Sequence, residues 1–432
     1  MNRTTRLVAP VAAVALAACA LTACSSDGSD AAGGSTVTWS TWGTPDELTA
    51  FEEFNEEFMQ RHPDITVDFQ PVASYDDYQS KLTTQLTSGT APDVFYVGDD
   101  SIAAMVSNGV LAPLSDRLSA AGSAISADDF SESIYQVAMA DGEIYGLPND
   151  VNPDALWYSK DALAAAGITQ DPAELADADE WTTETFFEMT AAMQDAGLTG
   201  AAFWNYWATT ASIMVSQGGT VYDDAGAYVA NSDPTSVAAL QEWADRFADG
   251  ELAVADTLPT GGDADTLFVT GRLGFLVQGR YTVATIEGAG LDTEDFDVVR
   301  WPTADGTAAP AGVASSFLAI NKDAEDADAA YTFFSEFLSA DGQTLRLSDN
   351  GNALPSISGI DDIVTESGTP AHVASLIEMR DLGFTNFPTE AAVPGLSASI
   401  STDIMLPLYQ GKTTAQEALD QTAALVAEKT GE

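Results

Sequence analysis

The chain has 432 residues, of which 45% are hydrophobic and 9% aromatic, so it can fill real cores and is too long for a single one. Its 66 acidic residues outnumber its 15 Lys and Arg residues, and the net charge of −51 argues against binding to nucleic acid or to anionic lipid headgroups. The acids are spread along the chain, which indicates a solvated acidic surface. From the length of the chain we expect two lobes or domains, and we expect the protein to be a monomer.

The first 23 residues have the pattern of a bacterial lipoprotein signal peptide. Arg3 and Arg6 form a basic start, residues 7–20 form an apolar stretch too short to span a bilayer, and Leu-Thr-Ala-Cys24 matches a lipobox. An ordinary cleavage site with an incidental cysteine is the alternative. We expect lipidation at Cys24, which would hold the protein on the extracytoplasmic face of the cell membrane through the lipid alone.

Cleavage also determines what chemistry the folded part can carry. Cys19 lies in the cleaved peptide and Cys24 is the predicted lipidation site, so the fold retains no thiol. Only His62 and His372 remain as histidines, so we expect no metal site and no cofactor.

A flexible tether over residues 24–35 precedes the first predicted strand, residues 37–40. Thr44, followed by Pro45 and by Glu47, predicts the start of a capped helix. Further strands and helices alternate through the first part of the chain; the expected strands are 65–69 and 93–97, and a helix begins at Ser74. This alternation predicts an α/β fold with a parallel, doubly wound sheet.

The stretch 143–160 indicates a crossing between two lobes. The apolar run 144–147 stops at Pro148, which predicts a strand end, and polar residues precede a second strand over 155–159. The α/β pattern then repeats with helices over 161–166, 182–196 and 233–250 and strands over 273–277 and 296–300. Residues 303–310 predict the return crossing, and 351–355 a third. The later elements are a strand over 316–320, a helix with its buried face from Ala327 to Phe337, and a last helix from Thr414 to Lys429.

These crossings predict two lobes built from alternating segments. The first lobe comprises residues 36–148 and 308–352, and the second comprises 149–307 and 353–432.

Several fragments in this order resemble the family 1 solute-binding proteins of ABC importers, which include maltose-binding protein. They are the lipobox at Cys24, Ala-Pro-Asp-Val at 91–94, Tyr-Gly-Leu-Pro at 145–148, Leu-Trp-Tyr-Ser-Lys at 156–160, and the segments 268–279 and 410–419. The resemblance implies two doubly wound lobes joined by three crossings, of the type II periplasmic-binding-protein class. It also implies that a sugar binds between the lobes, closes them about a hinge and is passed to the permease subunits.

A sugar site needs aromatic platforms for C–H faces and polar groups for hydroxyls. Trp42 follows the first strand and is a candidate platform, with a place in the core as the alternative. Tyr96 and Asp99 end the third strand, where the resemblance places an aromatic and a carboxylate; alternatively Asp99 caps the next helix. Polar residues of the crossing, which are alternatively turn residues, are further candidates: Asn149, Asp150 and Asn152.

Some rings of the aromatic cluster 203–207 must lie in the core, and Trp204 or Trp207 is a candidate platform in the second lobe. Arg280 and Tyr281 replace the Pro-Trp that the family often has after Gly279, and Arg280 would suit the carboxylate of an acidic sugar. Trp301 and Arg380 complete the set. Ser397 to Ser399 stand where the family has an aromatic, which argues against a long maltodextrin.

The sequence thus predicts a sugar-binding lipoprotein of an ABC importer. A secreted, lipid-anchored enzyme acting on carbohydrate, or a binding protein for another small solute such as an acidic sugar, is the alternative. With 66 acids, paired carboxylates arise by chance, and no Gly-x-Ser-x-Gly, P-loop or His-Glu-x-x-His pattern is present, so we expect no catalysis. An adhesion lipoprotein would explain the anchor but not the crossings.

Overall fold

The computed structural model describes residues 34–43, 45–72, 74–258, 263–348 and 352–431. The predicted signal peptide, Cys24 and the tether as far as residue 33 lie outside this part. So do Thr44, the predicted cap, and Gly351, the predicted start of the third crossing. Within it, no helix has both the length and the apolar character needed to cross a membrane.

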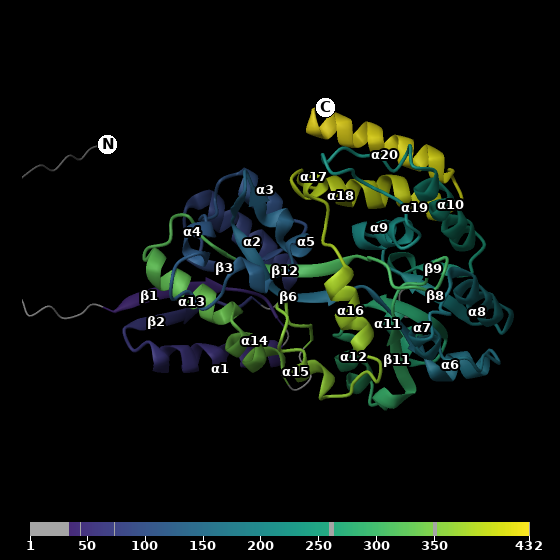
Figure 1. Ribbon diagram of the computed structural model, residues 1–432, viewed down its shortest axis with the longest axis horizontal. Helices are drawn as coiled ribbons and strands as arrows, with labels where there is room; N and C mark the ends of the chain where they lie inside the picture. Colours follow the sequence, from purple (N-terminus) through teal and green to yellow (C-terminus); the bar gives the residue numbers. More distant parts are fainter. Residues whose placement is uncertain (1–33, 44, 73, 259–262, 349–351, 432) are drawn as a thin grey trace, which may run out of the picture.

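Two five-stranded sheets organise the chain, one in each lobe (Figure 1). The first sheet has the order β2 (Ile65–Phe69), β1 (Ser35–Ser40), β3 (Val94–Gly98), β12 (Val313–Ile320) and β6 (Gly146–Pro153). The second has the order β11 (Phe296–Val299), β7 (Ala155–Ser159), β10 (Leu273–Gln278), β8 (Thr199–Phe203) and β9 (Leu252–Val254). A short pair, β4 (Met139–Ala140) and β5 (Glu143–Ile144), extends the first lobe.

Helices flank both sheets. Those of the first lobe are α1 (Pro45–Arg61), α2 (Tyr75–Ser88), α3 (Ile102–Ser107), α4 (Ser115–Leu118), α5 (Glu132–Tyr135), α13 (Ala327–Leu338) and α14 (Ala340–Leu347). Those of the second are α6 (Lys160–Ala165), α7 (Pro172–Asp177), α8 (Thr183–Asp195), α9 (Trp207–Val215), α10 (Pro234–Ala248), α11 (Ala264–Val269) and α12 (Thr282–Gly288). After the third crossing follow α15 (Asp362–Thr365), α16 (Ala374–Leu382), α17 (Pro388–Ala391), α18 (Leu396–Ser399), a π-helical turn (Ile400–Met405), α19 (Leu406–Tyr409) and α20 (Ala415–Thr430).

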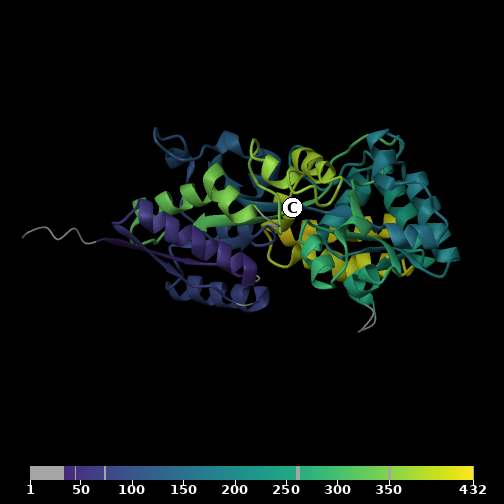
Figure 2. The ribbon, with the colours of Figure 1, turned by 90° about the horizontal axis from the view of Figure 1, so that it is seen from below.

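Each lobe has its own hydrophobic core. In the first, Trp39 is 1% exposed and packs on Phe69 and on Phe337 of α13. In the second, Trp243 lies between Phe186 and Trp301. In both views the purple N-terminal segment and the teal segment around α8 lie at opposite ends of the molecule (Figure 1, Figure 2). Two separate cores confirm the predicted two-lobed α/β fold.

The predicted strand end at Pro148 is wrong, because β6 continues to Pro153. Pro148 is tolerated because β6 is the edge strand of its sheet, where a missing N–H disrupts fewer ladder hydrogen bonds. Asn149 is an extra residue in a bulge opposite Ser316 and Phe317. The predicted lobe boundary after residue 148 falls inside this strand, and Asp154 alone separates β6 from β7.

The sheets are not wholly parallel, contrary to the prediction. β12 is antiparallel to β3 and β6, and β7 is antiparallel to β10 and β11. Both reversed strands follow a crossing directly. A chain that enters a lobe at the edge facing the other lobe must run away from that edge, so its first strand opposes the others.

Candidate functional site

The ends of the strands bring the polar and aromatic candidates to one place. The carboxyl ends of β1, β3 and β6 lead to Trp42, Asp99 and Asn152, and those of β8 and β10 lead to Tyr206 and Tyr281. Ligands of open α/β sheets bind at this edge. Because these edges of the two sheets face each other across the crossings, the residues line a cleft between the lobes.

The cleft contains two cavities. The first has a volume of about 520 Å³ and is lined by Trp42, Gly43, Glu47, Phe51, Tyr96, Asp150, Asn152, Tyr281, Ala284, Thr285, Asn352 and Ala353. The second has a volume of about 330 Å³ and is lined by Tyr75, Asp99, Asp100, Asn205, Tyr206, Trp207, Ala314, Glu390, Val393, Gly395, Ser397, Ala398, Ser401 and Thr402. Both volumes are within the range of small-molecule sites.

Aromatic rings connect the two cavities. The rings of Trp42 in the first cavity and Tyr75 in the second lie 5.2 Å apart, and Tyr96 meets Trp42 edge to face at 6.3 Å. From the other lobe, Tyr281 is 41% exposed at the start of α12, and Tyr206 packs against Trp207 at 6.1 Å. Both lobes therefore present flat apolar surfaces to the same space.

Asp99 does not cap the following helix. Its carboxylate accepts hydrogen bonds from the Ser315 N–H (3.2 Å) and from the Thr385 hydroxyl (3.3 Å), and Ser101 is the residue at the start of α3. Burial, reinforced by the neighbouring charge of Asp100, raises the pKa of Asp99 to about 8. At neutral pH this carboxyl group can thus hold a proton and donate a hydrogen bond.

Asp150 stands where β6 approaches the first cavity. It accepts hydrogen bonds from the Ser316 hydroxyl (2.7 Å) and from the Asn149 amide (2.8 Å). Burial raises its pKa to about 6, although the Ser316 hydrogen bond and the charge of Arg346 act in the opposite direction.

Asp154, the residue between the two sheets, was not among the predicted candidates. It is 4% exposed, its side chain accepts a hydrogen bond from the Tyr206 hydroxyl, and its carbonyl oxygen accepts one from Trp301 Nε1 (2.6 Å). Burial raises its pKa to about 7 against the lowering effect of Tyr206. This residue fixes the crossing to the second lobe.

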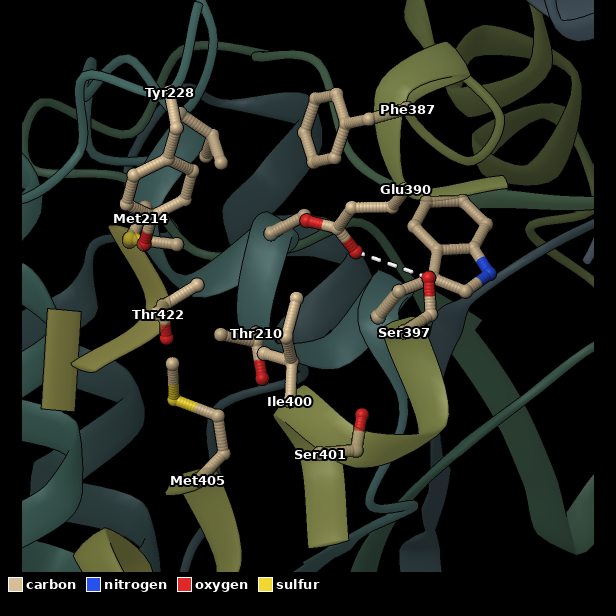
Figure 3. Close-up of a pocket in the computed structure, with 13 residues that line it drawn as sticks. Thr210, Met214, Tyr228, Phe387, Glu390, Ser397, Ile400, Ser401, Met405 and Thr422 are labelled. Carbon is tan, nitrogen blue, oxygen red and sulfur yellow. Dashed lines mark hydrogen bonds between the residues drawn. The ribbon is translucent and has the colours of Figure 1, made fainter. Parts of the chain in front are cut away.

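Behind the second cavity lies a smaller one of about 20 Å³, large enough for about one water molecule. Figure 3 shows Glu390 at its edge, with one carboxylate oxygen accepting a hydrogen bond from Ser397 (3.0 Å). The other oxygen accepts from Tyr222 (3.0 Å), and burial raises the pKa of Glu390. Glu390 and Ser397 line both cavities, so this pair forms the wall between them.

Two predicted candidates lie inside the lobes rather than at a cavity. Asn149 is 2% exposed at the bulge of β6, where its amide bonds to Asp150. Trp301 is 2% exposed and packs on Phe203 at 5.6 Å within the second core. Both positions are determined by packing that only the folded chain shows.

Three more predicted candidates, Arg280, Arg380 and Trp204, do not line either cavity. The Arg280 guanidinium is 1% exposed and reaches Ser367 (3.5 Å), whereas its backbone N–H bonds to Asn152 (2.9 Å). Arg380 is 4% exposed and pairs with Asp361 and Asp381. Trp204 packs against the second core and lines neither cavity.

Sequence reasoning also passed over residues that the cleft contains. Asn205 and Tyr206 lie two and three residues after the end of β8, and the position of ligand sites at the carboxyl ends of strands would have identified them. Glu47 was interpreted only as part of a helix cap, and it lines the first cavity. Ser401 and Thr402 belong to a π-helical turn, a feature often found at functional sites, for which the sequence offers no signal.

The described residues contain no group of three or more His, Cys, Asp or Glu side chains arranged to hold a metal ion. The arrangement offers stacking surfaces, hydroxyls, amides and carboxylates. It therefore suits a polar ligand that has flat apolar faces.

Comparisons with known proteins agree with this geometry. A family model described as bacterial extracellular solute-binding protein matches residues 42–344. Diacetylchitobiose binding protein DasA of Streptomyces coelicolor is 29% identical over 277 residues, which are 62% of this chain and 61% of that protein. A protein of Brucella abortus is 32% identical over 127 residues, which are 28% of this chain and 29% of that protein. The chain thus spans less than two thirds of these relatives.

Solved structures share the fold over almost the whole chain. The substrate-binding protein Lmo0181 of Listeria monocytogenes, in complex with cycloalternan, has a TM-score of 0.77 at 21% identity, covering 92% of this chain and 99% of that one. The cyclic α-maltosyl-1,6-maltose binding protein of Arthrobacter globiformis has a TM-score of 0.77 at 19% identity, covering 92% and 99%. Both likenesses concern the fold.

Proposed function

Because the chain belongs to the bacterial extracellular solute-binding protein family, we propose that it captures a mono- or oligosaccharide for an ABC importer. The sugar enters the cleft, the lobes close around it, and the loaded protein delivers it to the permease subunits. Closure needs a ligand that binds the closed form better, and a ligand held by both lobes meets this condition.

The observation that carries the proposal is the composition of the cleft. Tyr96 and Trp42 of one lobe and Tyr281 of the other surround a cavity whose remaining wall includes Asp150 and Asn152. Pyranose rings pack their C–H faces on such rings and direct their hydroxyls to carboxylates and amides. The substrates named for DasA, Lmo0181 and the Arthrobacter protein are all oligosaccharides, which supports the same class here.

An acidic sugar is a weaker candidate. Its carboxylate would need a cation, and Arg280, the residue that suggested this ligand, directs its guanidinium to Ser367. The second cavity instead adds carboxylates to the cleft. The named relatives are binding proteins, and we propose the same passive role for this chain.

Further parts of the proposal rest on the sequence. Cleavage before Cys24 and lipidation of that residue would hold the protein at the extracytoplasmic face of the membrane. We also propose that the protein is a monomer. The lobe limits 36–148 with 308–352, and 149–307 with 353–432, stay predictions, as does the tether over 24–35.

The first test is ligand binding by the lipid-free protein. A sugar that binds should raise the melting temperature, because a ligand at about 100 times its Kd stabilises the folded state by about 2.7 kcal/mol. X-ray scattering should show a smaller radius of gyration with the same sugar. A broad panel of mono- and oligosaccharides that moves neither quantity would contradict the proposal, and melting with amino acids and short peptides provides the control.

A further inference from the structure

The cleft contains many acids and, among the described residues that line its two cavities, no Lys, Arg or His. The carboxylates are Glu47 and Asp150 in the first cavity and Asp99, Asp100 and Glu390 in the second. In a chain with 66 acids and 15 bases this count alone decides little. The surroundings of the individual carboxylates are more informative.

Three carboxylates in or beside the cleft, the half-buried Asp99 and the buried Asp154 and Glu390, are held by neutral partners. Asp99 accepts from Ser315 and Thr385, Asp154 from Tyr206, and Glu390 from Tyr222 and Ser397. No ion pair formed within the described part of the chain includes any of these three acids. Without a cation the protonated forms of these acids are favoured over the carboxylates, and a positively charged ligand would stabilise the carboxylate forms.

The nearby cations are committed elsewhere. Arg346 stacks over Phe337 with its guanidinium 3.9 Å from the ring centroid, and Arg380 pairs with Asp361. The Arg280 guanidinium reaches Ser367, and Arg280 lines neither cavity. The protein thus keeps its own positive charges out of the space that the ligand would occupy.

The second cavity has aromatic residues as well as carboxylates that could bind a cation. Tyr75, Tyr206 and Trp207 also line it, and the faces of aromatic rings attract ammonium groups. Asp99 and Asp100 directly follow β3 of the first lobe, whereas Glu390 lies on α17 after the third crossing. A single cation here would contact groups from both sides of the cleft.

We propose that the ligand is an amino sugar whose protonated amine lies in the second cavity between Asp99, Asp100 and Glu390. This inference rests on the proposed function and narrows its substrate class. A neutral sugar, whose hydroxyls also bond to carboxylates, is the competing ligand.

Pairs of sugars that differ in their amines would distinguish an amino-sugar ligand from a neutral one. Calorimetry near neutral pH would compare glucose, galactose and mannose with their 2-amino counterparts, and cellobiose with chitobiose and N,N′-diacetylchitobiose. Since a hydrogen bond to a charged group adds about 1.5–3 kcal/mol, the amine should bind about tenfold or more tightly than its hydroxyl partner in at least one set. The acetylated dimer should lose this advantage.

Variants locate the amine. Asp100→Asn, at an exposed position, and Glu390→Gln should each weaken binding of the amine about fivefold or more beyond any loss of affinity for its neutral partner. Asp195→Asn, at the exposed end of α8, is the matched control and should change neither.

Neutral sugars that bind as tightly as their amines in every set would overturn this inference and leave the proposed function intact. Retention of the full amine preference in both Asp100→Asn and Glu390→Gln would also overturn it. If no sugar in these sets and none in the broad panel of mono- and oligosaccharides binds, the proposed function fails together with the inference.

Discussion

Arg280 and Tyr281 are adjacent in the chain, but only Tyr281 reaches the cleft. Tyr281 is 41% exposed at the first cavity, and Arg280 is 1% exposed with its side chain directed to Ser367. The sequence identified both as candidates because the strand ends just before them. It could not distinguish them, because the direction of each side chain depends on how the turn after Gly279 packs on Asn152.

Replacing Tyr281 tests its role as a stacking surface. Tyr281→Ala should weaken sugar binding by about 1.5–3 kcal/mol, the value of burying one large apolar side chain, and calorimetry would measure it. The melting temperature without ligand should change little, because Tyr281 is 41% exposed and lies outside the packed cores. Unchanged affinity would place the sugar outside the first cavity.

Trp301 should behave in the opposite way. It is buried between Phe203 and Trp243, and its Nε1 bonds to the carbonyl oxygen of Asp154. Trp301→Ala should lower the free energy of unfolding by about 3–5 kcal/mol, as large-to-small core changes do, which urea titration would measure. A variant of normal stability and reduced affinity would instead place Trp301 at the ligand.

Asp99 should make stability depend on pH. Burial raises its pKa to about 8 in the folded chain, against about 3.9 when unfolded. Between these values the folded chain holds a proton that the unfolded chain releases, so the free energy of unfolding falls as pH rises. Asp99→Asn should therefore raise the melting temperature by a few degrees near pH 8 and by little near pH 4. Equal effects at both pH values, by calorimetry, would contradict this assignment.

At the scale of elements, the sequence predicted the two-lobed α/β fold and several candidates that line the cleft. Trp42, Asp99 and Tyr281 follow strands at their carboxyl ends, a rule that needs only the order of elements. The reversed strands β7 and β12 were missed, because strand direction depends on where the chain re-enters a lobe. The strand end predicted at Pro148 was wrong because a proline is tolerated in an edge strand, and the sequence does not show that β6 lies at the edge of its sheet.

The contact between β10 and β6 can be tested at Gly279. A Cβ on this residue would lie 2.7 Å from the Asn152 Cβ and 2.5 Å from its Oδ1, the atom that accepts from the Arg280 N–H. Gly279→Ala should lose this hydrogen bond and lower the free energy of unfolding by about 1–3 kcal/mol. It should also weaken sugar binding, because Asn152 lines the first cavity.

Gly288 provides the control for that substitution. It ends α12, and a Cβ there has no atom within 4 Å. Gly288→Ala should leave binding unchanged and stabilise the fold by up to about 1 kcal/mol. If thermal melting and calorimetry show the same small effect for both variants, the two lobes do not depend on close packing at Gly279.

At the scale of the whole molecule, charge is the dominant feature. Loss of Arg3 and Arg6 with the predicted signal peptide leaves 13 basic residues against 66 acids, a net charge of −53. Repulsion among these acids opposes the compact state. Raising the salt concentration from about 0.01 M to about 1 M shortens the screening length roughly tenfold, so the melting temperature should rise. A flat or falling melting temperature would show that local ion pairs, such as Arg300 with Asp179 (3.3 Å), outweigh the overall repulsion.

The place of β12 in the first sheet has a consequence for biosynthesis. β12 lies between β3 and β6 and supplies the hydrogen bonds that join them, but it is made from residues 313–320. When the ribosome has translated all the strands of the second sheet, the first sheet therefore still lacks its β12 strand. Neither lobe can complete its fold early, because the core of the second lobe also takes residues from α16, α18, α19 and α20, which are translated after β12.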